Sequence, residues 1–420
     1  MKDPRTIAYD FLCEVLLNHA YANLTLKNGL YGLDEHDKAL ITALVYTTLR
    51  YQPHTRALWS PLVEKQPKAK VGVLLDMAVT QLVHLDKLPA YAVVDESVKL
   101  AKKRFPETSG LINAVLRKIA SDPTREVVGS TALETHALNL ALPTWIYAMW
   151  VKQLGEDRAR DIAEALLDEA AMCVRINPLK IDPQVILRDP RVRPGFLAPY
   201  AAYGEIAWLT TDWFHEGQLI IQDEASQRVA AFSGVLPHQR VLDLCSAPGS
   251  KSTAMAAMMA NTGSILACDV SMARLKLVDQ QAQRLGVINL TTQVLDGTTV
   301  HQQGFDPFDV VLVDAPCSGL GVVRHKPDIK VHLTPSVLDS LVILQRQLLD
   351  SAAQVVKVGG TLIYSTCTIN TKENQAQVKH FVINHPQFTL IEEHQILPQD
   401  YGTDGFYMAK LQRQDANVVE

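Results

Sequence analysis

Hydrophobic residues in the first third of the chain recur at the spacing of a helix. Ile7, Phe11 and Val15 lie four residues apart, sets with the same interval follow as far as Leu82, and Val93 and Val98 continue the apolar pattern. This period gathers apolar side chains on one face of an amphipathic helix. We therefore predict that residues 3–119 form helices around a shared core.

A polar stretch follows this first helical region. Residues 122–130 begin with Asp-Pro and lack a hydrophobic period, which is typical of a linker. Helical periodicity returns over residues 133–171, where Trp145 and Trp150 are predicted to be core residues. Short apolar runs then predict strands at residues 172–176, 206–209 and 219–221.

After residue 237 the pattern changes to a strand, a turn and a helix, several times over. Because this alternation is typical of a doubly wound α/β sheet, we predict a largely parallel sheet. The last two strand candidates have no helix between them, which predicts a terminal antiparallel hairpin. Strands are predicted at 240–245, 264–269, 288–295, 308–314, 360–365, 388–392 and 405–411, and helices at 250–260, 271–285, 335–357 and 371–384.

These patterns predict a multidomain chain. An all-α domain is expected at residues 1–125, a small α+β unit at 131–225 and an α/β doubly wound, Rossmann-like domain at 226–420. The formal net charge is −5, but residues 1–120 carry a net +4 and the rest a net −9. A mildly basic front on an acidic body suits a module that docks on RNA.

The six cysteines are scattered, and no C-x-x-C pair occurs. Metal sites and redox motifs usually need such close spacing, so no metal is expected. We see no charged-then-apolar pattern typical of a signal peptide and no unbroken apolar run of about 18 residues. We expect a reduced, soluble, cytoplasmic protein.

Two predicted strands end in turns that hold a cysteine. Residues 309–321 read DVVLVDAPCSGLG and residues 359–368 read GGTLIYSTCT. In an open parallel sheet, ligands bind at the carboxyl ends of the strands. Asp314, Cys317 and Cys367 could therefore face one pocket, with two thiols reached by substrate.

The first strand of the sheet ends in residues 243–251, DLCSAPGSK, which contain neither G-x-G-x-x-G nor a phosphate-binding loop. Asp269 ends the second strand, where an acid can accept hydrogen bonds from ribose, and Asp296 ends the third, near an adenine amino group. S-adenosylmethionine fits such acids because it carries a sulfonium cation. Its carboxylate could rest on the helix that begins near Gly249.

Five segments in this order, DLCSAPGSK, ACDVS, LDGTT, VDAPCSG and YSTCT, preceded by FHEGQLIIQDEASQ, resemble the RNA cytosine-C5 methyltransferases of the Nol1/Nop2/Sun family. The resemblance covers residues 214–411. The helical front, which ends in GLINAVLRKI at 110–119, resembles the NusB-type domain of a bacterial member. Ser250 stands where the family usually has a second glycine, and it can supply the same amide.

The resemblance implies a set of functional residues. Cysteine chemistry and proton transfer are implied for Cys367, Cys317, Asp314 and Lys251. Cofactor contacts are implied for Cys245, Ser246, Ala247, Pro248, Gly249, Lys251, Asp269, Arg274, Asp296 and Asp314. The implied RNA is 16S ribosomal RNA, with candidate contacts from Arg175, Asn177, Lys180, Arg324 and Lys326. The chain is expected to act as a monomer.

The chemistry of such a reaction needs covalent catalysis, because C5 of cytosine is a poor nucleophile. A thiolate that adds at C6 makes C5 able to attack a methyl donor. Asp314 is the acid placed to protonate or hydrogen-bond N3. On sequence logic alone either cysteine could attack; the resemblance implies that Cys367 attacks and that Cys317 assists product release.

Other function classes fit less well. An exocyclic-amine methyltransferase would need an N/D-P-P-Y loop and no thiols, and a nicotinamide dehydrogenase would need the missing glycines. A non-enzymatic RNA-binding or assembly factor could keep the same fold. The pair of cysteines in the two turns argues against that last alternative.

Overall fold

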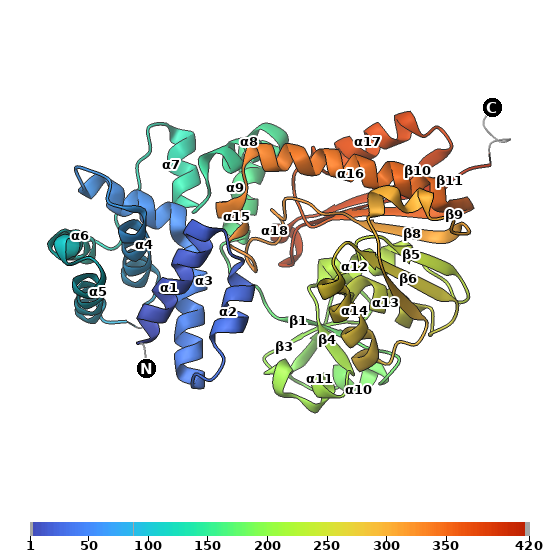
Figure 1. Ribbon diagram of the computed structural model, residues 1–420, viewed down its shortest axis with the longest axis horizontal. Coiled ribbons are helices and arrows are strands. Elements are labelled where there is room, and N and C mark those ends of the chain that lie inside the picture. The colour runs from blue at the N-terminus through green and yellow to red at the C-terminus, as the bar shows by residue number, and fades with distance from the viewer. Residues whose placement is uncertain (1–2, 87, 416–420) are drawn as a thin grey trace. The chain divides into compact units, whose positions relative to one another are not determined.

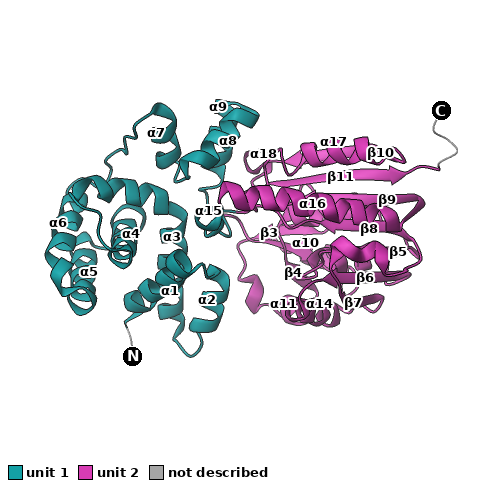
Figure 2. Ribbon diagram, turned by 45° about the horizontal axis from the view of Figure 1, so that its top comes forward, with its two compact units in different colours: residues 1–169, 323–333 teal, residues 170–322, 334–420 magenta. Residues whose placement is uncertain are grey.

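The computed structural model describes residues 3–86 and 88–415 of the chain. It divides into two compact units (Figures 1 and 2). The helical unit comprises residues 1–169 and 323–333, and the sheet unit comprises residues 170–322 and 334–420.

Helices build the first unit, as the hydrophobic period predicts. Asp3 and Asp34 cap α1 and α3 by accepting hydrogen bonds from the amides of Thr6 and Asp37. Such caps satisfy amides that have no partner inside the helix. The helices are α1 Pro4–Asn18, α2 Ala22–Gly29, α3 Glu35–Trp59, α4 Ala69–His84, α5 Ala90–Arg104, α6 Ser109–Ala120, α7 Ala132–Asn139, α8 Thr144–Leu154, α9 Glu156–Ala165 and α15 Ile329–His332, with 3₁₀ turns η1 Ser60–Leu62 and η2 Pro106–Thr108.

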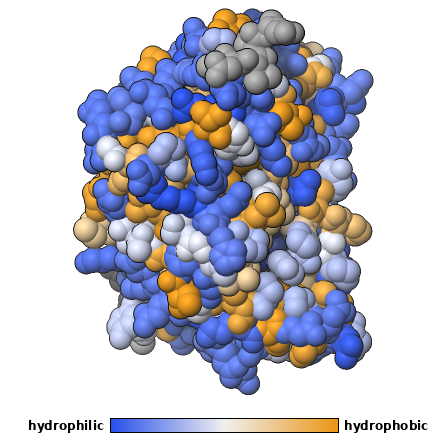
Figure 3. Space-filling model, turned by 90° about the vertical axis from the view of Figure 1, so that its right-hand side faces the viewer, coloured by the Kyte–Doolittle hydropathy of each residue, from blue (hydrophilic) through white to orange (hydrophobic). Residues whose placement is uncertain are grey.

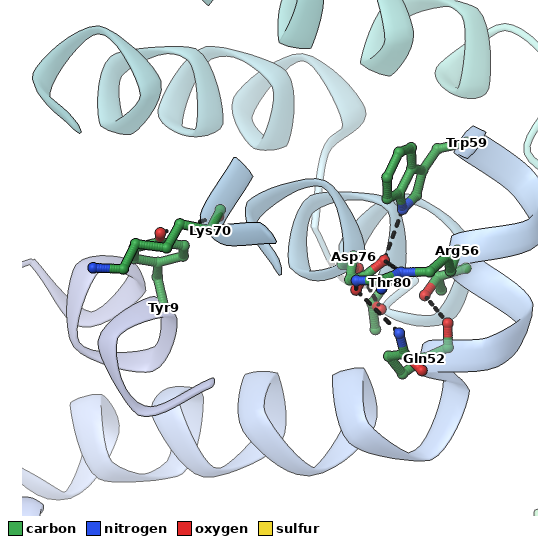
Figure 4. A network of polar contacts seen from close by, with 8 residues as sticks. Tyr9, Gln52, Arg56, Trp59, Lys70, Asp76 and Thr80 are labelled. Carbon is green, nitrogen blue, oxygen red and sulfur yellow. Dashed lines mark hydrogen bonds and ion pairs between the residues drawn. The ribbon is translucent and has the colours of Figure 1, made fainter. Parts of the chain in front are cut away.

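A buried acid joins α3 to α4 inside this unit (Figure 4). Asp76 has no exposed surface and accepts hydrogen bonds from Arg56 at 2.5 Å, the Trp59 indole at 2.7 Å and Gln52 at 3.3 Å. Burial raises the pKa of Asp76 despite the neighbouring Arg56. Several donors around one carboxylate compensate for its removal from water.

Residues 323–333 leave the sheet unit and pack within the helical unit. Lys330, which is 4% exposed, donates hydrogen bonds to the carbonyls of Arg50 and Ala141, the latter at 2.7 Å. Asp328 accepts from the Ala22 amide at 3.3 Å. The chain thus returns to its first helices some 200 residues after their linker, which the sequence pattern does not predict.

The small sheet has the strand order β2-β3-β1-β4, with antiparallel pairs. Its strands are β1 Cys173–Ile176, β2 Val192–Pro194, β3 Ala201–Gly204 and β4 Leu219–Ile221, with α10 Pro183–Leu187, η3 Trp208–Thr210 and α11 Asp212–His215 beside them. The strand predicted at 206–209 is wrong, because buried Trp208 begins a 3₁₀ turn there. Strand β3 was missed since its Ala-Ala-Tyr-Gly sequence has low strand preference.

The compact units and the burial of two tryptophans bear on two further predictions. The predicted unit at 131–225 includes helices α7 to α9, yet residues 131–169 group with the helical unit. Trp150 is fully buried as expected, whereas Trp145 is half-buried.

The large sheet has the order β10-β11-β9-β8-β5-β6-β7. Strands β9, β8, β5, β6 and β7 pair in parallel with their neighbours. The β10–β11 hairpin pairs with β9 through β11 in the antiparallel direction, as predicted. The strands are β5 Arg240–Asp243, β6 Ser264–Asp269, β7 Leu290–Val294, β8 Phe308–Asp314, β9 Val356–Thr366, β10 Phe388–Ile396 and β11 Phe406–Arg413.

Helices cover both faces of this sheet, which explains why its central strands are apolar throughout. Helices α16 and α17 lie on one face, and α12, α13 and α14 lie on the other (Figure 1). The bounds are α12 Glu224–Ser233, α13 Ser250–Met258, α14 Met272–Leu285, η4 Gly297–Gln302, α16 Pro335–Val355, α17 Gln375–Asn384 and α18 Pro398–Tyr401.

The surface drawn in Figure 3 mixes hydrophilic and hydrophobic residues. Exposed apolar side chains of the sheet unit, such as Val270, Ile288 and Val358, belong to separate elements or turns. Among the described residues, no helix is long and apolar enough to cross a membrane.

Candidate active site

The two cysteine turns meet at one edge of the sheet. Strands β8 and β9 are parallel neighbours, and Asp314 is in register with Ser365. Their carboxyl ends therefore lie side by side. The Cys317 and Cys367 sulfurs are 3.4 Å apart, so the structure brings together the thiols that the sequence separates by 50 residues.

Backbone hydrogen bonds hold the two turns in this position. The Ala315 amide donates to the Ser365 carbonyl at 2.9 Å, and the Gly321 amide donates to the Cys367 carbonyl at 3.0 Å. A Cβ atom at Gly321 would lie 1.9 Å from the carbonyl oxygen of Gly405, so the close approach requires glycine. Both thiols are thus held by a rigid scaffold.

An ion pair lies beside the thiols. Lys251 Nζ is 2.6 Å from Asp314 Oδ2, and the Ser365 hydroxyl donates to Asp314 Oδ1 at 2.7 Å. Lys251 is 8% exposed and lies over the Phe406 ring at 5.3 Å. Burial lowers the pKa of Lys251, but Asp314 and then Cys367 raise it more, so the net pKa is above its usual value.

The surroundings of the two thiols differ in charge. The pKa of Cys317 is well above its usual value because of its hydrogen bond to Cys367, burial, and the negative charges of Cys367 and Glu373. Cys367 instead interacts electrostatically with the Lys251 ammonium. A nearby cation favours a thiolate and a nearby anion favours a thiol.

The loop after β5 forms a second part of the site. The Ser246 amide donates to the Cys268 carbonyl at 2.8 Å, and Gly249 has a φ of 97°, a conformation suited to glycine. No side chain caps the start of α13 at Ser250. Cys245 is half-buried, Ala247 is buried and Pro248 is exposed. The uncapped amides can receive an anion such as a carboxylate.

The strand-end acids differ in how fully they are engaged. Asp269, 3% exposed, accepts from the Ser271 amide at 3.0 Å and pairs with Arg274 at 3.0 Å; Arg274 also reaches the Ala247 carbonyl at 3.0 Å. Asp296 is exposed and caps η4 by accepting from the Thr298 amide. Asp269 and Arg274 therefore join the turns after β5 and β6.

Asp243 and Ser246 each have a buried oxygen that lacks a hydrogen-bond partner. Asp243 Oδ2 accepts from Ser252 at 2.6 Å, but its Oδ1 and the Ser246 hydroxyl have no partner among the described residues. Burial raises the pKa of Asp243 to about 7. Buried polar atoms normally have partners. The uncapped helix and these oxygens suit a ligand with a carboxylate and several donors, as S-adenosylmethionine has.

The candidate RNA contacts fall into two groups. Lys180 and Lys326 are exposed, whereas Arg324 is 5% exposed within the segment 323–333. Asn177 is 3% exposed and donates to the carbonyls of Gly217 and Leu285. Asn177 therefore links the segments that contain Gly217 and Leu285 through its side-chain amide.

Arg175 is also turned inward. It is 4% exposed and donates to Gln222 at 2.5 Å, the Ser250 carbonyl at 2.5 Å and Thr253 at 3.0 Å. Burial, with a smaller effect from Arg284, lowers the pKa of Arg175 to about 9. This geometry suits support of the loop that begins α13 more than contact with RNA.

Sequence reasoning missed three polar residues at the cysteine turns. Ser365, Gln345 and Glu373 are buried, and all three hydrogen-bond to groups in or beside the turns. Ser365 is a polar residue within an apolar strand, and Glu373 is an acid just after the YSTCT turn. Polar residues in predicted buried segments are the available signal.

Three family descriptions match parts of the chain. Residues 234–412 match "16S rRNA methyltransferase RsmB/F", residues 2–121 match the "NusB family", and residues 142–189 match the RsmF/B-like ferredoxin-like domain. The last range spans the end of the helical unit and the start of the sheet unit.

Two curated relatives are similar over nearly their whole length. "Probable ribosomal RNA small subunit methyltransferase B" of Bacillus subtilis is 34% identical, covering 97% of this chain and 98% of the relative. "Ribosomal RNA small subunit methyltransferase B" of Vibrio cholerae is 32% identical, covering 98% and 97%.

Solved structures share the fold. A crystal structure of PH0851 covers 98% of this chain and 99% of its own, with a TM-score of 0.81 and 24% identity. A methyltransferase homologue from Pyrococcus horikoshii covers 68% of this chain and 100% of its own, with a TM-score of 0.61 and 26% identity.

Proposed function

Because this chain belongs to the 16S rRNA methyltransferase RsmB/F family, we propose that it methylates C5 of a cytosine in 16S ribosomal RNA through a covalent cysteine intermediate. The general activity follows from family membership: the chain is an rRNA methyltransferase that uses S-adenosylmethionine. The atom that is methylated and the roles of the thiols are the proposal.

The loops after β5 and β6 would hold the cofactor. The amides at the start of α13 suit its carboxylate, and the free oxygens of Asp243 and Ser246 suit donor groups. Asp269 would accept hydrogen bonds from the ribose. When bound, S-adenosylmethionine supplies an electrophilic methyl group on a sulfonium sulfur.

Cys367 is the better candidate for the nucleophile. Its neighbour Lys251 carries a positive charge that favours a thiolate, whereas Cys317 lies near the Glu373 carboxylate. The Cys367 thiolate forms a bond to C6 of the cytosine, and the C5–C6 electron pair becomes available at C5. This preference comes from charge, independently of the family resemblance.

The Asp314 and Lys251 pair would manage the charge that develops on the ring. Addition at C6 moves electron density toward N3 and O2, so a donor at N3 lowers the barrier. Lys251 and Asp314 lie 2.6 Å apart beside the thiols, and Ser365 fixes the orientation of Asp314. The pair can deliver a hydrogen bond or a proton.

Cys317 would act after the new C5–methyl bond has formed. A base must remove the C5 proton, and the electrons of that C–H bond then restore the C5–C6 double bond while Cys367 leaves as a thiolate. Once Cys367 is bonded to C6, it no longer carries the charge that raises the pKa of Cys317, so Cys317, 3.4 Å away, can lose its proton to solvent and accept the C5 proton. Its raised pKa keeps it from competing for C6 in the first step.

The substrate base must lie outside an RNA double helix when it enters the site. An enzyme that reacts at C5 and C6 takes the base out of its stack, so an unpaired or distorted stretch of 16S rRNA is expected. Lys180 and Lys326 are exposed candidates for phosphate contacts. The basic region 1–120 is a candidate for docking the RNA.

One observation carries the proposal: two thiols 3.4 Å apart, beside a Lys–Asp pair, at the ends of adjacent parallel strands. The test is a map of 5-methylcytosine across 16S rRNA from cells with and without the protein. We expect one or a few sites to disappear in its absence. An unchanged map, or loss of a methyl group on another atom, would contradict the proposal.

A further inference from the structure

A buried carboxylate lies behind the two cysteine turns. Glu373 has no exposed surface. Its Oε1 accepts from the Ser318 amide at 2.8 Å and Gln345 at 3.1 Å, and its Oε2 accepts from the Ser318 hydroxyl at 2.6 Å and Asn370 at 2.9 Å. An ionised carboxylate only accepts, so four donors match that form. No described residue forms an ion pair with it.

Glu373 and Gln345 hold the chain on both sides of Cys317. Gln345 donates to the Pro316 carbonyl at 2.9 Å while it also donates to Glu373, and Glu373 accepts from the Ser318 amide. The residues before and after the thiol are therefore both tied to one buried cluster. Removal of the carboxylate would leave the Ser318 amide without its acceptor.

The same cluster reaches the other thiol. The hydroxyls of Ser318 and Thr368 are 2.7 Å apart, and each follows one of the cysteines directly in the chain. The Tyr364 hydroxyl donates to the Glu373 carbonyl at 2.6 Å, which anchors Glu373 to strand β9. Hydrogen bonds through Glu373 and Ser318 thus connect the Cys317 turn to the Cys367 turn.

The charge of Glu373 also acts on Cys317. Its negative charge contributes to the raised pKa of Cys317, after the Cys367 hydrogen bond, burial and the Cys367 charge. Lys251 interacts electrostatically with Cys367. The two buried charges therefore favour opposite protonation states in two neighbouring sulfurs.

We propose that Glu373 is a positioning residue that holds the Cys317 and Cys367 turns together and makes the two thiols unequal. The proposal deepens the proposed function, on which it rests for the roles of the thiols. Without Glu373, Cys317 would lose both its fixed place beside Cys367 and its nearby negative charge. Elimination of the product would then slow more than the initial attack.

The first test needs no RNA. Alkylation of Cys317 by iodoacetamide is followed by peptide mass spectrometry from pH 6 to 11 in the full-length Cys367→Ala protein, with and without Glu373→Gln. Because the charge is lost, we expect the half-maximal pH of alkylation to fall by about one unit. Glu392→Gln, at an exposed acid 2.6 Å from His394, is the matched control and should cause no shift.

The second test uses RNA and the wild-type cysteines. Glu373→Gln should keep S-adenosylmethionine affinity within about two-fold, lower turnover about 10- to 100-fold and accumulate a protein–RNA adduct. Ser318→Ala, which removes the hydroxyl link but keeps the amide contact, should have a smaller effect in the same direction. Ser318→Ala also replaces Glu373→Gln as the test variant if Glu373→Gln does not fold.

The outcomes separate the two proposals. An unshifted alkylation profile with Glu373→Gln, or turnover within two-fold of the parent, would overturn the role of Glu373. If Glu373→Gln does not fold, normal turnover in Ser318→Ala would overturn it. A parent protein that makes neither adduct nor 5-methylcytosine would contradict the proposed function, while the alkylation profile would still decide the role of Glu373.

Discussion

Asp76 in the helical unit and Asp314 in the sheet unit are both acids paired with a cation. They differ in how much of the carboxylate remains exposed for a ligand. Asp76 is fully buried and accepts from Arg56, Trp59 and Gln52 (Figure 4). The Asp314 side chain is 25% exposed and accepts from Lys251 and Ser365. The first carboxylate is enclosed by protein donors, and the second keeps an open side beside two thiols.

The position of each acid in its element explains this difference. Asp76 lies in the middle of α4, where every residue from Val71 to Gln81 is buried, so its partners must come from the packed helices. Asp314 is the last residue of β8, where the strand opens into a turn. A mid-helix acid therefore stabilises packing, whereas a strand-end acid remains available to a ligand.

The largest expected effect is on the activity of the strand-end acid. Asp314→Asn should lower methylation about 10²- to 10⁴-fold, because the pair with Lys251 loses its charge and its role in proton transfer. Some stability should also be lost, because Lys251 is buried and loses its charged partner, so turnover is measured well below the unfolding temperature of the variant. Turnover on 16S rRNA measures the effect, and a variant with near-normal turnover would remove Asp314 from the mechanism.

Asp76→Asn should lower stability without lowering activity. We expect a loss of about 1–3 kcal/mol in unfolding free energy, because an amide places a donor against the Arg56 and Trp59 donors. The loss is moderate since Arg56 is itself half-exposed. Turnover of the folded protein should be normal at low temperature. Denaturant titration measures the loss, and equal stability would show that the network contributes little.

Asp269 provides an intermediate case, since it is a buried strand-end acid that already pairs with Arg274. Asp269→Ala should weaken S-adenosylmethionine about 10- to 100-fold, because the ribose hydroxyls lose an acceptor. Asp279→Ala, on the exposed side of α14, is the control. Calorimetry would contradict the assignment if Asp269→Ala bound the cofactor normally.

The smallest effect concerns a buried base in the helical unit. Burial, with help from Arg50, lowers the pKa of Lys330 to about 7. The unfolded chain then binds more protons than the folded one between about pH 7 and the usual lysine pKa of 10.5. Stability should therefore rise with pH in this window, by at most about 1.4 kcal/mol per pH unit.

Lys330→Met should remove this rise, whereas Lys326→Met, at an exposed lysine of the same segment, should keep it. Denaturant titrations at pH 7, 8 and 9 give the slope of the unfolding free energy against pH for each protein. Equal slopes in the parent and in Lys330→Met would show that the buried amine does not change its protonation on folding.

The sequence predicts the site best where parallel strands carry it. Asp314, Cys317 and Cys367 could be placed together because adjacent parallel strands end at one edge. Glu373 could not, since its role depends on four donor groups from three residues, Ser318, Gln345 and Asn370, that come together only in the folded chain. The return of residues 323–333 to the helical unit was also beyond prediction, because Lys330 finds its partners at Arg50 and Ala141 only in the folded chain.

The central claim, that two neighbouring thiols divide attack from release, is tested most directly by covalent trapping. Full-length Cys317→Ala, Cys367→Ala and the control Cys13→Ala are each incubated with S-adenosylmethionine and 16S rRNA and run on a denaturing gel. Cys317→Ala should accumulate a protein–RNA adduct, Cys367→Ala should form none and make no 5-methylcytosine, and Cys13→Ala should turn over normally. An adduct with Cys367→Ala would reverse the two roles, and methylation by the double variant would contradict the thiol mechanism.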